Sequence, residues 1–172
     1  MSVPYVTLIR PVVARLAAEF RIPGGAAPEA MLIAIGLQES RFRHRDQIVK
    51  GKAKGVLGPA TGFWQFEKGG GVRGVMGHPA SRRVARACAE EAGLPWEAEA
   101  IWQAFATPEG DEIACVFARL LLFTDPAPLP KADAALTDAA WDYYLRNWRP
   151  GKPHRATWDG FWQEAVRIAT SG

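Results

Sequence analysis

The sequence predicts a single, mainly α-helical domain that is interrupted once by loops with at most a short β-hairpin. Apolar residues recur at helical spacing in seven segments, and Gly- and Pro-rich breaks separate these segments. Between them, the interval 41–66 is too rich in glycine and too broken by Pro59 for a helix. With 172 residues, no internal repeat and no long linker, the chain has the length of one domain, which we expect to span residues 1–172.

The first two helices are predicted by apolar spacing and by the break between them. Residues 11–20 place apolar side chains at positions 12, 13, 16, 17 and 20, which share one helical face. The stretch "RIPGGAAPEA" ends this helix, and Pro28 and Glu29 suit the first turn of a second one, over 28–40.

Five further helices are expected after the glycine run at 69–71. The breaks "GLP", "TPEG", "TDPAPLP" and "RPGKP" separate them. Their predicted ranges are 79–92, 97–106, 111–123, 133–148 and 157–169.

Composition excludes some classes of protein. Hydrophobic residues make up 48% and charged residues 23% of the chain, which is typical of a globular protein and not of a disordered one. The N-terminal "MSVPYVTLIRPVVARLAAEF" has no basic start followed by an apolar core, and no run of about 18 apolar residues follows, so we expect neither a signal peptide nor a transmembrane helix.

The charge, cysteine and histidine patterns narrow the possible kinds of site but do not identify a class of protein. The net charge of the chain is +3, and basic residues are concentrated in 41–54, where six Lys or Arg residues stand against the single acid Asp46; the segment is either solvated or faces an anionic partner. Cys88 and Cys115 are expected to be buried free thiols. The three histidines are far apart and no cysteine pair is close in sequence, so we expect no metal site and no cofactor.

The second predicted helix is apolar on all sides and ends in Glu39. A helix of this kind is normally buried, and Glu39 continues the stripe of Ile35 at i+4. Burial and the negative end of the helix dipole both disfavour the charged carboxylate, which predicts a raised pKa and a group able to act as a general acid. The alternative is an ion pair with Arg43 at i+4, which would lower that pKa.

About twenty residues later, "GPATGFWQF" has the composition of a ligand-binding loop. Gly58 and Gly62 permit positive φ and close approach of the backbone to a ligand, and Gln65 offers a donor and an acceptor. Phe63 and Trp64 have flat apolar faces that could stack on sugar rings, although such a pair is more often part of a core.

Together, these two motifs resemble those of the lytic transglycosylase and goose-type lysozyme superfamily. The first motif corresponds to Glu39 and Ser40, and the second to Gly58, Ala60, Gly62, Phe63, Trp64 and Gln65, so the resemblance covers about the first half of the chain. It implies a lysozyme-like fold and cleavage of the β-1,4 bond between N-acetylmuramic acid and N-acetylglucosamine in peptidoglycan. Glu39 would then be the acid, Ser40 would orient the carboxyl or the sugar, and Gln65 and a tyrosine would hold the substrate.

The family's third motif supplies that tyrosine, and here the chain departs from the pattern with "AAWDYYLRNWRPGKP". Tyr143 and Asn147 share one helical face, whereas Tyr144 lies on a face with Trp141 and Trp148 that resembles a core face. Periodicity therefore favours Tyr143 for a cleft, and Tyr144 remains an alternative.

The reaction type is open between hydrolase and transglycosylase. In the lytic transglycosylases one acid suffices, because the muramic C6 hydroxyl closes onto C1. An inverting hydrolase needs a second carboxylate, for which Asp46 and Glu67 are the candidates; Glu67 and Gln65 are two residues apart and would face one cleft in an extended segment.

Two other classes of function are compatible with parts of the sequence. Proteins that resemble this family also occur in phage virions and tails, where the fold can bind cell wall without activity. A nucleic-acid-binding module would use the basic segment 41–54 and "RNWRPGKPHR", but no known binding signature accompanies them, so no nucleic acid partner is expected.

The resemblance and the lack of a signal peptide together suggest a phage or prophage protein. It would be made in the host cytoplasm and act in the periplasm or cell wall, or be carried in a virion. We expect a monomer that binds peptidoglycan glycan strands.

Overall fold

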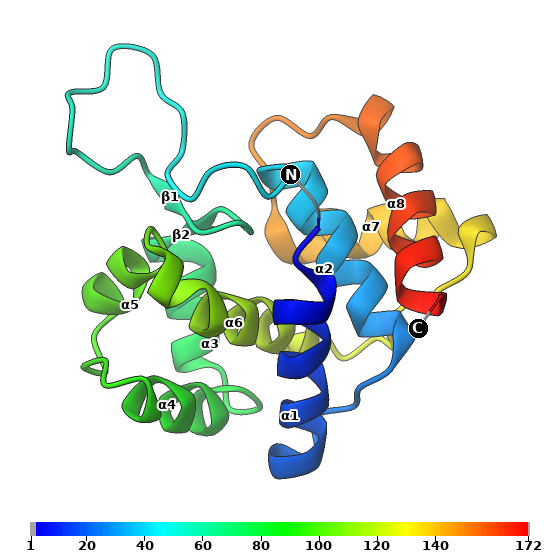
Figure 1. Cartoon of the computed structure of the whole chain (residues 1–172), viewed down its shortest axis with the longest axis horizontal. Helices are drawn as coiled ribbons and strands as arrows, with labels where there is room; N and C mark the ends of the chain where they lie inside the picture. The colour runs from blue at the N-terminus through cyan, green and yellow to red at the C-terminus, as the bar shows by residue number, and fades with distance from the viewer. Residues whose placement is uncertain (1–2, 172) are drawn as a thin grey trace.

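The computed structural model describes residues 3–171, and within them it is mainly helical with one small antiparallel sheet (Figure 1). The helices are α1 (Arg10–Phe20), α2 (Ala26–Glu39), α3 (Arg73–Gly77), α4 (Arg82–Glu91), α5 (Ala98–Ala104), α6 (Asp111–Thr124), α7 (Thr137–Trp148) and α8 (Arg155–Thr170). The sheet pairs β1 (Ala60–Thr61) with β2 (Phe66–Glu67), and short π or 3-10 turns cover Tyr5–Ile9, Lys68–Val72, Pro108–Gly110 and Ala134–Leu136. The mainly α prediction with a short hairpin is confirmed; residues 1–2 and 172 of the expected domain lie outside the described residues.

All seven predicted segments contain an α-helix, with boundaries that differ by a few residues. The segment 133–148 was predicted as one helix, but it begins with the 3-10 turn Ala134–Leu136 and becomes α-helical only in α7. Helix α3 was not predicted, since "RGVMG" is short, contains two glycines and has no helical periodicity. Burial of Val72 and Val75 in the core accounts for its formation.

Helix α2 is the centre of the molecule. Its residues from Ala30 to Ile35 have no exposed surface, as expected for a helix that is apolar all round. In Figure 1, α2 runs between α8 on one side and α1 and α6 on the other, and α8 makes its most extensive contact with α2. The carboxyl end of α2 is therefore fixed by packing, together with the residues that follow it.

The chain turns sharply after α2 because Arg41 and Phe42 both adopt positive φ, at 53°. This turn lays the buried Phe42 ring directly over Gly36, one helical turn before the end of α2. A Cβ atom on Gly36 would overlap the ring. Glycine at position 36 thus allows the turn that follows Glu39.

Replacing Gly36 with alanine is expected to destabilise the protein by about 2 kcal/mol, because the added methyl group overpacks a closed contact. Urea unfolding would measure the loss. The matched control is Gly160→Ala in α8, where a Cβ atom meets nothing within 4 Å; helix propensity then predicts a gain of up to about 1 kcal/mol. Equal effects of the two changes would contradict the overpacking argument.

Helices α7 and α8 contact each other through a stack of aromatic rings. The Tyr144 and Trp158 rings are 5.0 Å apart at their centroids and inclined by 15°, and Trp158 and Trp162 are 6.4 Å apart and inclined by 10°. Both tryptophans have no exposed surface, and their Nε1 atoms donate to the carbonyl oxygens of Thr137 and Asp133. The stack fixes the position of Tyr144.

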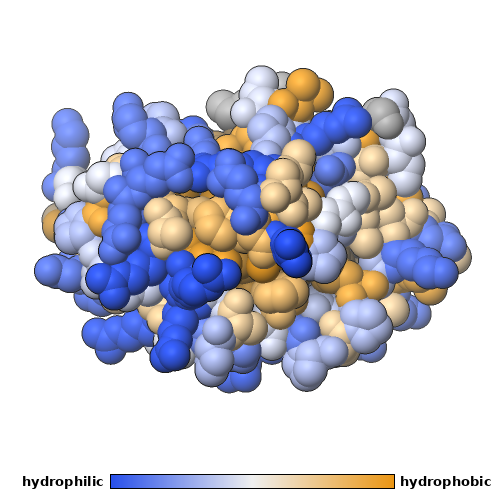
Figure 2. Space-filling view, turned by 90° about the horizontal axis from the view of Figure 1, so that it is seen from below, coloured by the Kyte–Doolittle hydropathy of each residue, from blue (hydrophilic) through white to orange (hydrophobic). Residues whose placement is uncertain are grey.

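The helices and the surface of the molecule bear on how it could meet a membrane. Within residues 3–171, no helix is both long and apolar enough to cross a membrane. Figure 2 shows hydrophobic residues in the middle of the lower face with hydrophilic residues around them, and exposed apolar surface of this kind is common in folded proteins.

Cys88 and Cys115 are buried free thiols, as predicted, and burial raises the pKa of Cys88 to about 11.

Candidate functional site

Glu39, the last residue of α2, is largely removed from water but retains some exposed surface. The Tyr144 hydroxyl donates to its Oε1 atom at 2.6 Å. The pKa of Glu39 is raised to about 7: burial is the largest cause, the hydrogen bond from Tyr144 lowers the pKa, and the negative charge of Glu67 raises it. At neutral pH, Glu39 is therefore divided between its protonated and ionised forms, which suits a group that donates and later accepts a proton.

Arg43 does not form the ion pair that was considered as an alternative. Its side chain is exposed, and no arginine contributes to the pKa of Glu39. The turn at Arg41 and Phe42 rotates the following residue away from the helical position where i+4 pairing would occur. The carboxyl group of Glu39 consequently has Tyr144 as its hydrogen-bonding partner and not a cation.

The tyrosine beside Glu39 is Tyr144, not Tyr143, which periodicity had favoured. Tyr143 turns the other way, and its hydroxyl donates to the carbonyl oxygen of Leu122 at 2.8 Å. Asn147, on the same face, donates to Asp125 and to the carbonyl oxygen of Tyr143, so it also lies away from Glu39. The face of α7 that resembles a core face does bury the Tyr144 ring, while its hydroxyl reaches the carboxylate.

Removing the Tyr144 hydroxyl is expected to raise the pKa of Glu39 above 7, because this hydrogen bond lowers it. If Glu39 is the essential acid, Tyr144→Phe shifts the alkaline limb of its pH–activity profile upward. Tyr143→Phe is the matched control: it removes a buried hydrogen bond, costing about 1 kcal/mol of stability, and leaves the limb unchanged. A shift in both variants, or in neither, would contradict the assignment of Tyr144.

Ser40 positions the backbone and does not face a ligand. It is 2% exposed, and its Oγ atom donates to the carbonyl oxygen of Phe63 at 2.7 Å. The same oxygen accepts the N–H of Phe42 at 3.1 Å. Ser40 thus ties the end of α2 to the loop between β1 and β2, instead of orienting the carboxyl or a sugar as the resemblance implied.

The loop between β1 and β2 is a closed turn over residues 62–65. Gly62 has φ +78°, as expected for a position that favours glycine, and its carbonyl oxygen accepts from the backbone N–H and the Nε2 atom of Gln65, at 3.0 and 2.8 Å. Gln65 is half-buried. With its amide nitrogen held in the turn, its amide oxygen is left as the group that can accept from a ligand.

Phe63 and Trp64 belong to the core, which was the alternative reading for this pair. Their exposed fractions are 5% and 0%. Phe63 packs edge-on against Phe42, and the Trp64 Nε1 atom donates to the carbonyl oxygen of Leu32 in α2 at 2.9 Å. Neither ring presents a face to a sugar; both hold the loop against the helix that ends in Glu39.

Of the two candidate second carboxylates, Glu67 is the one near Glu39. It is exposed on β2, and its charge raises the pKa of Glu39. Lys68 does not pair with it, because Lys68 binds Glu99. Asp46 instead closes a loop: it accepts from the Gly58 N–H at 2.7 Å and pairs with Lys52, and these contacts outweigh burial and lower its pKa.

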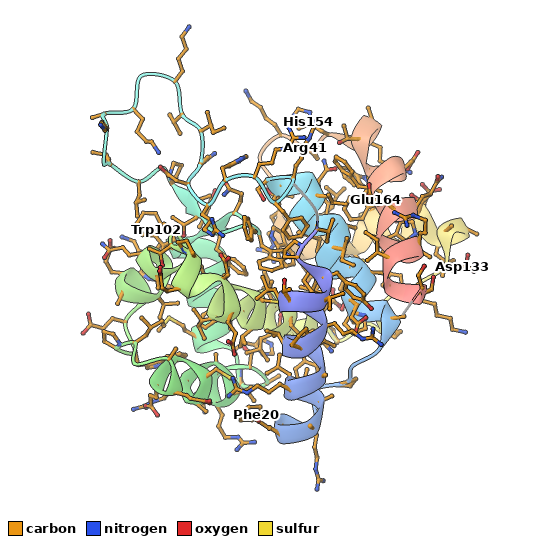
Figure 3. The ribbon with its side chains drawn as sticks, viewed as in Figure 1. Phe20, Arg41, Trp102, Asp133, His154 and Glu164 are labelled. Atoms are coloured by element: carbon orange, nitrogen blue, oxygen red, sulfur yellow. The ribbon has the colours of Figure 1, made fainter. Side chains whose placement is uncertain are left out.

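An open hollow of about 560 Å³ lies beside the end of α2, on the side of α8. It is lined by Gln38, Arg41, Pro153, His154, Arg155, Ala156, Thr157 and Phe161. Figure 3 places Arg41 and His154 next to each other at this opening. Gln38 and Arg41, which flank Glu39 in the sequence, line this hollow, but Glu39 itself does not.

The sequence did not predict the contribution of Trp158. Its ring stacks on Tyr144 and fixes the hydroxyl that binds Glu39, although the two residues come from different helices. No pairwise contact between α7 and α8 can be read from periodicity alone. The only signal was the aromatic pair of Trp158 and Trp162 at i+4 in the last predicted helix.

Among the described residues, no cluster of three or more His, Cys, Asp or Glu side chains could hold a metal ion. Comparison of the chain with protein families, with curated proteins and with solved structures gives no match.

Proposed function

We propose that this protein is a peptidoglycan-cleaving glycosidase of the lysozyme or lytic transglycosylase type, in which Glu39 is the general acid. The observation that supports this most is the state of Glu39: a half-buried carboxyl at a helix end, with a pKa near 7 and a tyrosine hydroxyl 2.6 Å away. Perturbed carboxyl groups of this kind are concentrated at catalytic sites. The resemblance of the Glu39–Ser40 and Gly58–Gln65 motifs supplies the substrate class.

In the proposed reaction, protonated Glu39 gives its proton to the glycosidic oxygen as the bond from that oxygen to C1 breaks. Positive charge develops at C1, and the ionised carboxylate of Glu39 is left to take a proton back. In a transglycosylase it takes this proton from the muramic C6 hydroxyl, whose oxygen bonds to C1; in an inverting hydrolase water bonds to C1 instead and gives its proton to a second carboxylate. Tyr144 stabilises the ionised form of Glu39, and Gln65 offers its amide oxygen to the sugar.

The two candidate reactions differ in whether they need a second carboxylate beside Glu39. A transglycosylase needs no second carboxylate, whereas an inverting hydrolase would use Glu67 to activate water on the opposite face of the sugar. Asp46 is not proposed for this role, since both of its oxygens bind within its own loop. The products therefore distinguish the two chemistries.

Digestion of purified sacculi followed by mass spectrometry of the released muropeptides tests the proposal. A transglycosylase releases fragments with 1,6-anhydro ends, and a hydrolase releases reducing ends. Release of neither would overturn the proposed activity. If the protein also sediments with intact sacculi without cleaving them, a cell-wall-binding virion or tail component becomes the better description.

The proposed cellular setting follows from the substrate class and from the resemblance of the Glu39–Ser40 and Gly58–Gln65 motifs. A phage or prophage protein of this type would reach the cell wall through a membrane lesion or inside a virion.

A further inference from the structure

Three of the four large hydrophobic side chains that are most exposed in residues 3–171 lie on one loop, at 47–59. Ile48, Val49 and Val56 are 78%, 42% and 55% exposed, and the fourth is Val6, near the N-terminus. Figure 1 shows this loop (cyan) projecting from β1 beyond the rest of the molecule. Scattered single apolar residues need no explanation, but three at one projecting tip do.

The loop is fastened at its base and free at its tip. At the base, the Gln47 N–H donates to the carbonyl oxygen of Ala60 at 3.1 Å, and Asp46 binds both the Gly58 N–H and Lys52. At the tip, Cβ atoms added to Gly51 or Gly55 would meet no atom within 4 Å. The loop is therefore held away from the protein surface and not folded onto it.

The tip is also cationic. Lys50 and Lys54 are exposed, and within the described residues neither forms an ion pair. Asp46 is the one acid among residues 41–59, and Lys52 neutralises it. The tip thus combines aliphatic side chains with two uncompensated positive charges.

We propose that the tip of the 47–59 loop binds the surface of an anionic phospholipid bilayer. Ile48, Val49 and Val56 would enter the boundary between headgroups and acyl chains, where apolar area leaves water. Lys50 and Lys54 would lie among the headgroups, with their methylene stems along the apolar layer and their ammonium groups at the phosphates.

A lipid surface fits the tip better than other anionic partners do. The loop contains no aromatic residue, so it has no ring to stack on a sugar of the glycan strand or on a nucleic acid base. A protein partner of ordinary size covers about 800 Å² on each side, far more than a loop tip offers. Shallow insertion of a few aliphatic side chains beside lysines needs no such area.

This inference is independent of the proposed glycosidase. No residue of the 47–59 loop forms a hydrogen bond or an ion pair with Glu39, whose described hydrogen-bonding partner is Tyr144. Binding to vesicles that contain no peptidoglycan therefore tests the loop alone. The inactive variant Glu39→Gln should bind vesicles as tightly as the wild type.

Sedimentation with sucrose-loaded vesicles measures the charge contribution. The wild type is expected to bind vesicles of phosphatidylcholine with phosphatidylglycerol more tightly than vesicles of phosphatidylcholine alone. Lys50→Gln with Lys54→Gln should weaken this binding about 25-fold, or about fivefold for each lysine. The matched control is Arg82→Gln with Arg83→Gln, which removes two exposed charges from α4 and should leave binding unchanged.

The apolar contribution is measured in the same way. Replacing Ile48, Val49 and Val56 with serine should weaken binding at least about tenfold, because three aliphatic side chains no longer leave water. Val6→Ser is the control, as it removes an exposed aliphatic side chain outside the loop and should leave binding unchanged.

Wild-type binding that is no tighter to phosphatidylglycerol vesicles, or loop variants that bind them as the wild type does, would overturn the proposal. So would loop variants that lose binding to lipid-free sacculi but keep binding to vesicles, because the glycan would then be the partner of the tip.

Discussion

Glu39→Gln is expected to lower the rate of muropeptide release by about a thousandfold, because the amide cannot donate a proton to the leaving oxygen. The side chain keeps its shape and can still accept from the Tyr144 hydroxyl, so the fold should be retained. The rate is measured with purified sacculi, and folding by circular dichroism. Unchanged release would contradict the role of Glu39.

The matched control is Glu164→Gln, which makes the same change at an exposed position of α8 (Figure 3). It should release muropeptides at the wild-type rate. A comparable loss in both variants would mean that the assay reports net charge and not catalysis.

Glu39→Gln is also expected to have a pH-dependent effect on stability. The pKa of Glu39 rises from an ordinary 4.5 to about 7 on folding, so the folded state binds more protons than the unfolded state between these values. Its contribution to stability is fully present below pH 4.5 and is lost as the pH rises through 7. Relative to the wild type, Glu39→Gln should therefore gain up to about 3 kcal/mol between pH 4.5 and pH 8. Urea unfolding at several pH values measures this gain, and a constant difference would contradict the raised pKa.

Trp158→Ala is expected to reduce the free energy of unfolding by about 3 to 5 kcal/mol, because Trp158 is fully buried and its removal leaves a large cavity. Tyr144 also loses the ring on which it stacks. Since small domains are stable by about 5 to 15 kcal/mol, urea unfolding should show a much lower midpoint.

Trp96→Ala is the control for this change. Trp96 is only half-buried, so its loss should cost about 1 kcal/mol. A loss below about 1.5 kcal/mol for Trp158→Ala would mean that α7 and α8 do not depend on the aromatic stack.

All helices except α3, and the raised pKa of Glu39, could be predicted from the sequence because they depend on local pattern. The apolar periodicity of 28–40 predicts a buried helix, and a carboxyl that continues the apolar stripe of such a helix is expected to be desolvated. Gly62 is similar, since its positive φ is a property of the turn itself.

The partners of Glu39 could not be predicted, because they depend on packing between distant segments. Tyr143 and Tyr144 are adjacent in sequence, and their assignment depends on which face of α7 meets α2 and α8. The polar face that Tyr143 shares with Asn147 favoured Tyr143 as the partner of Glu39. A tyrosine with a buried ring can also place its hydroxyl at the edge of the core, and Tyr144 does so. The inward positions of Ser40, Phe63 and Trp64 also depend on packing between distant segments, because these residues tie the β1–β2 loop to α2.

The stacked rings of Tyr144, Trp158 and Trp162 make this site observable by spectroscopy without a label. One end of the stack is hydrogen-bonded to a carboxyl group that titrates near neutral pH, and two near-parallel indole rings form the rest. The absorbance and emission of these rings depend on the electric field around them. Ionisation of Glu39 is therefore expected to change the optical signal of these rings.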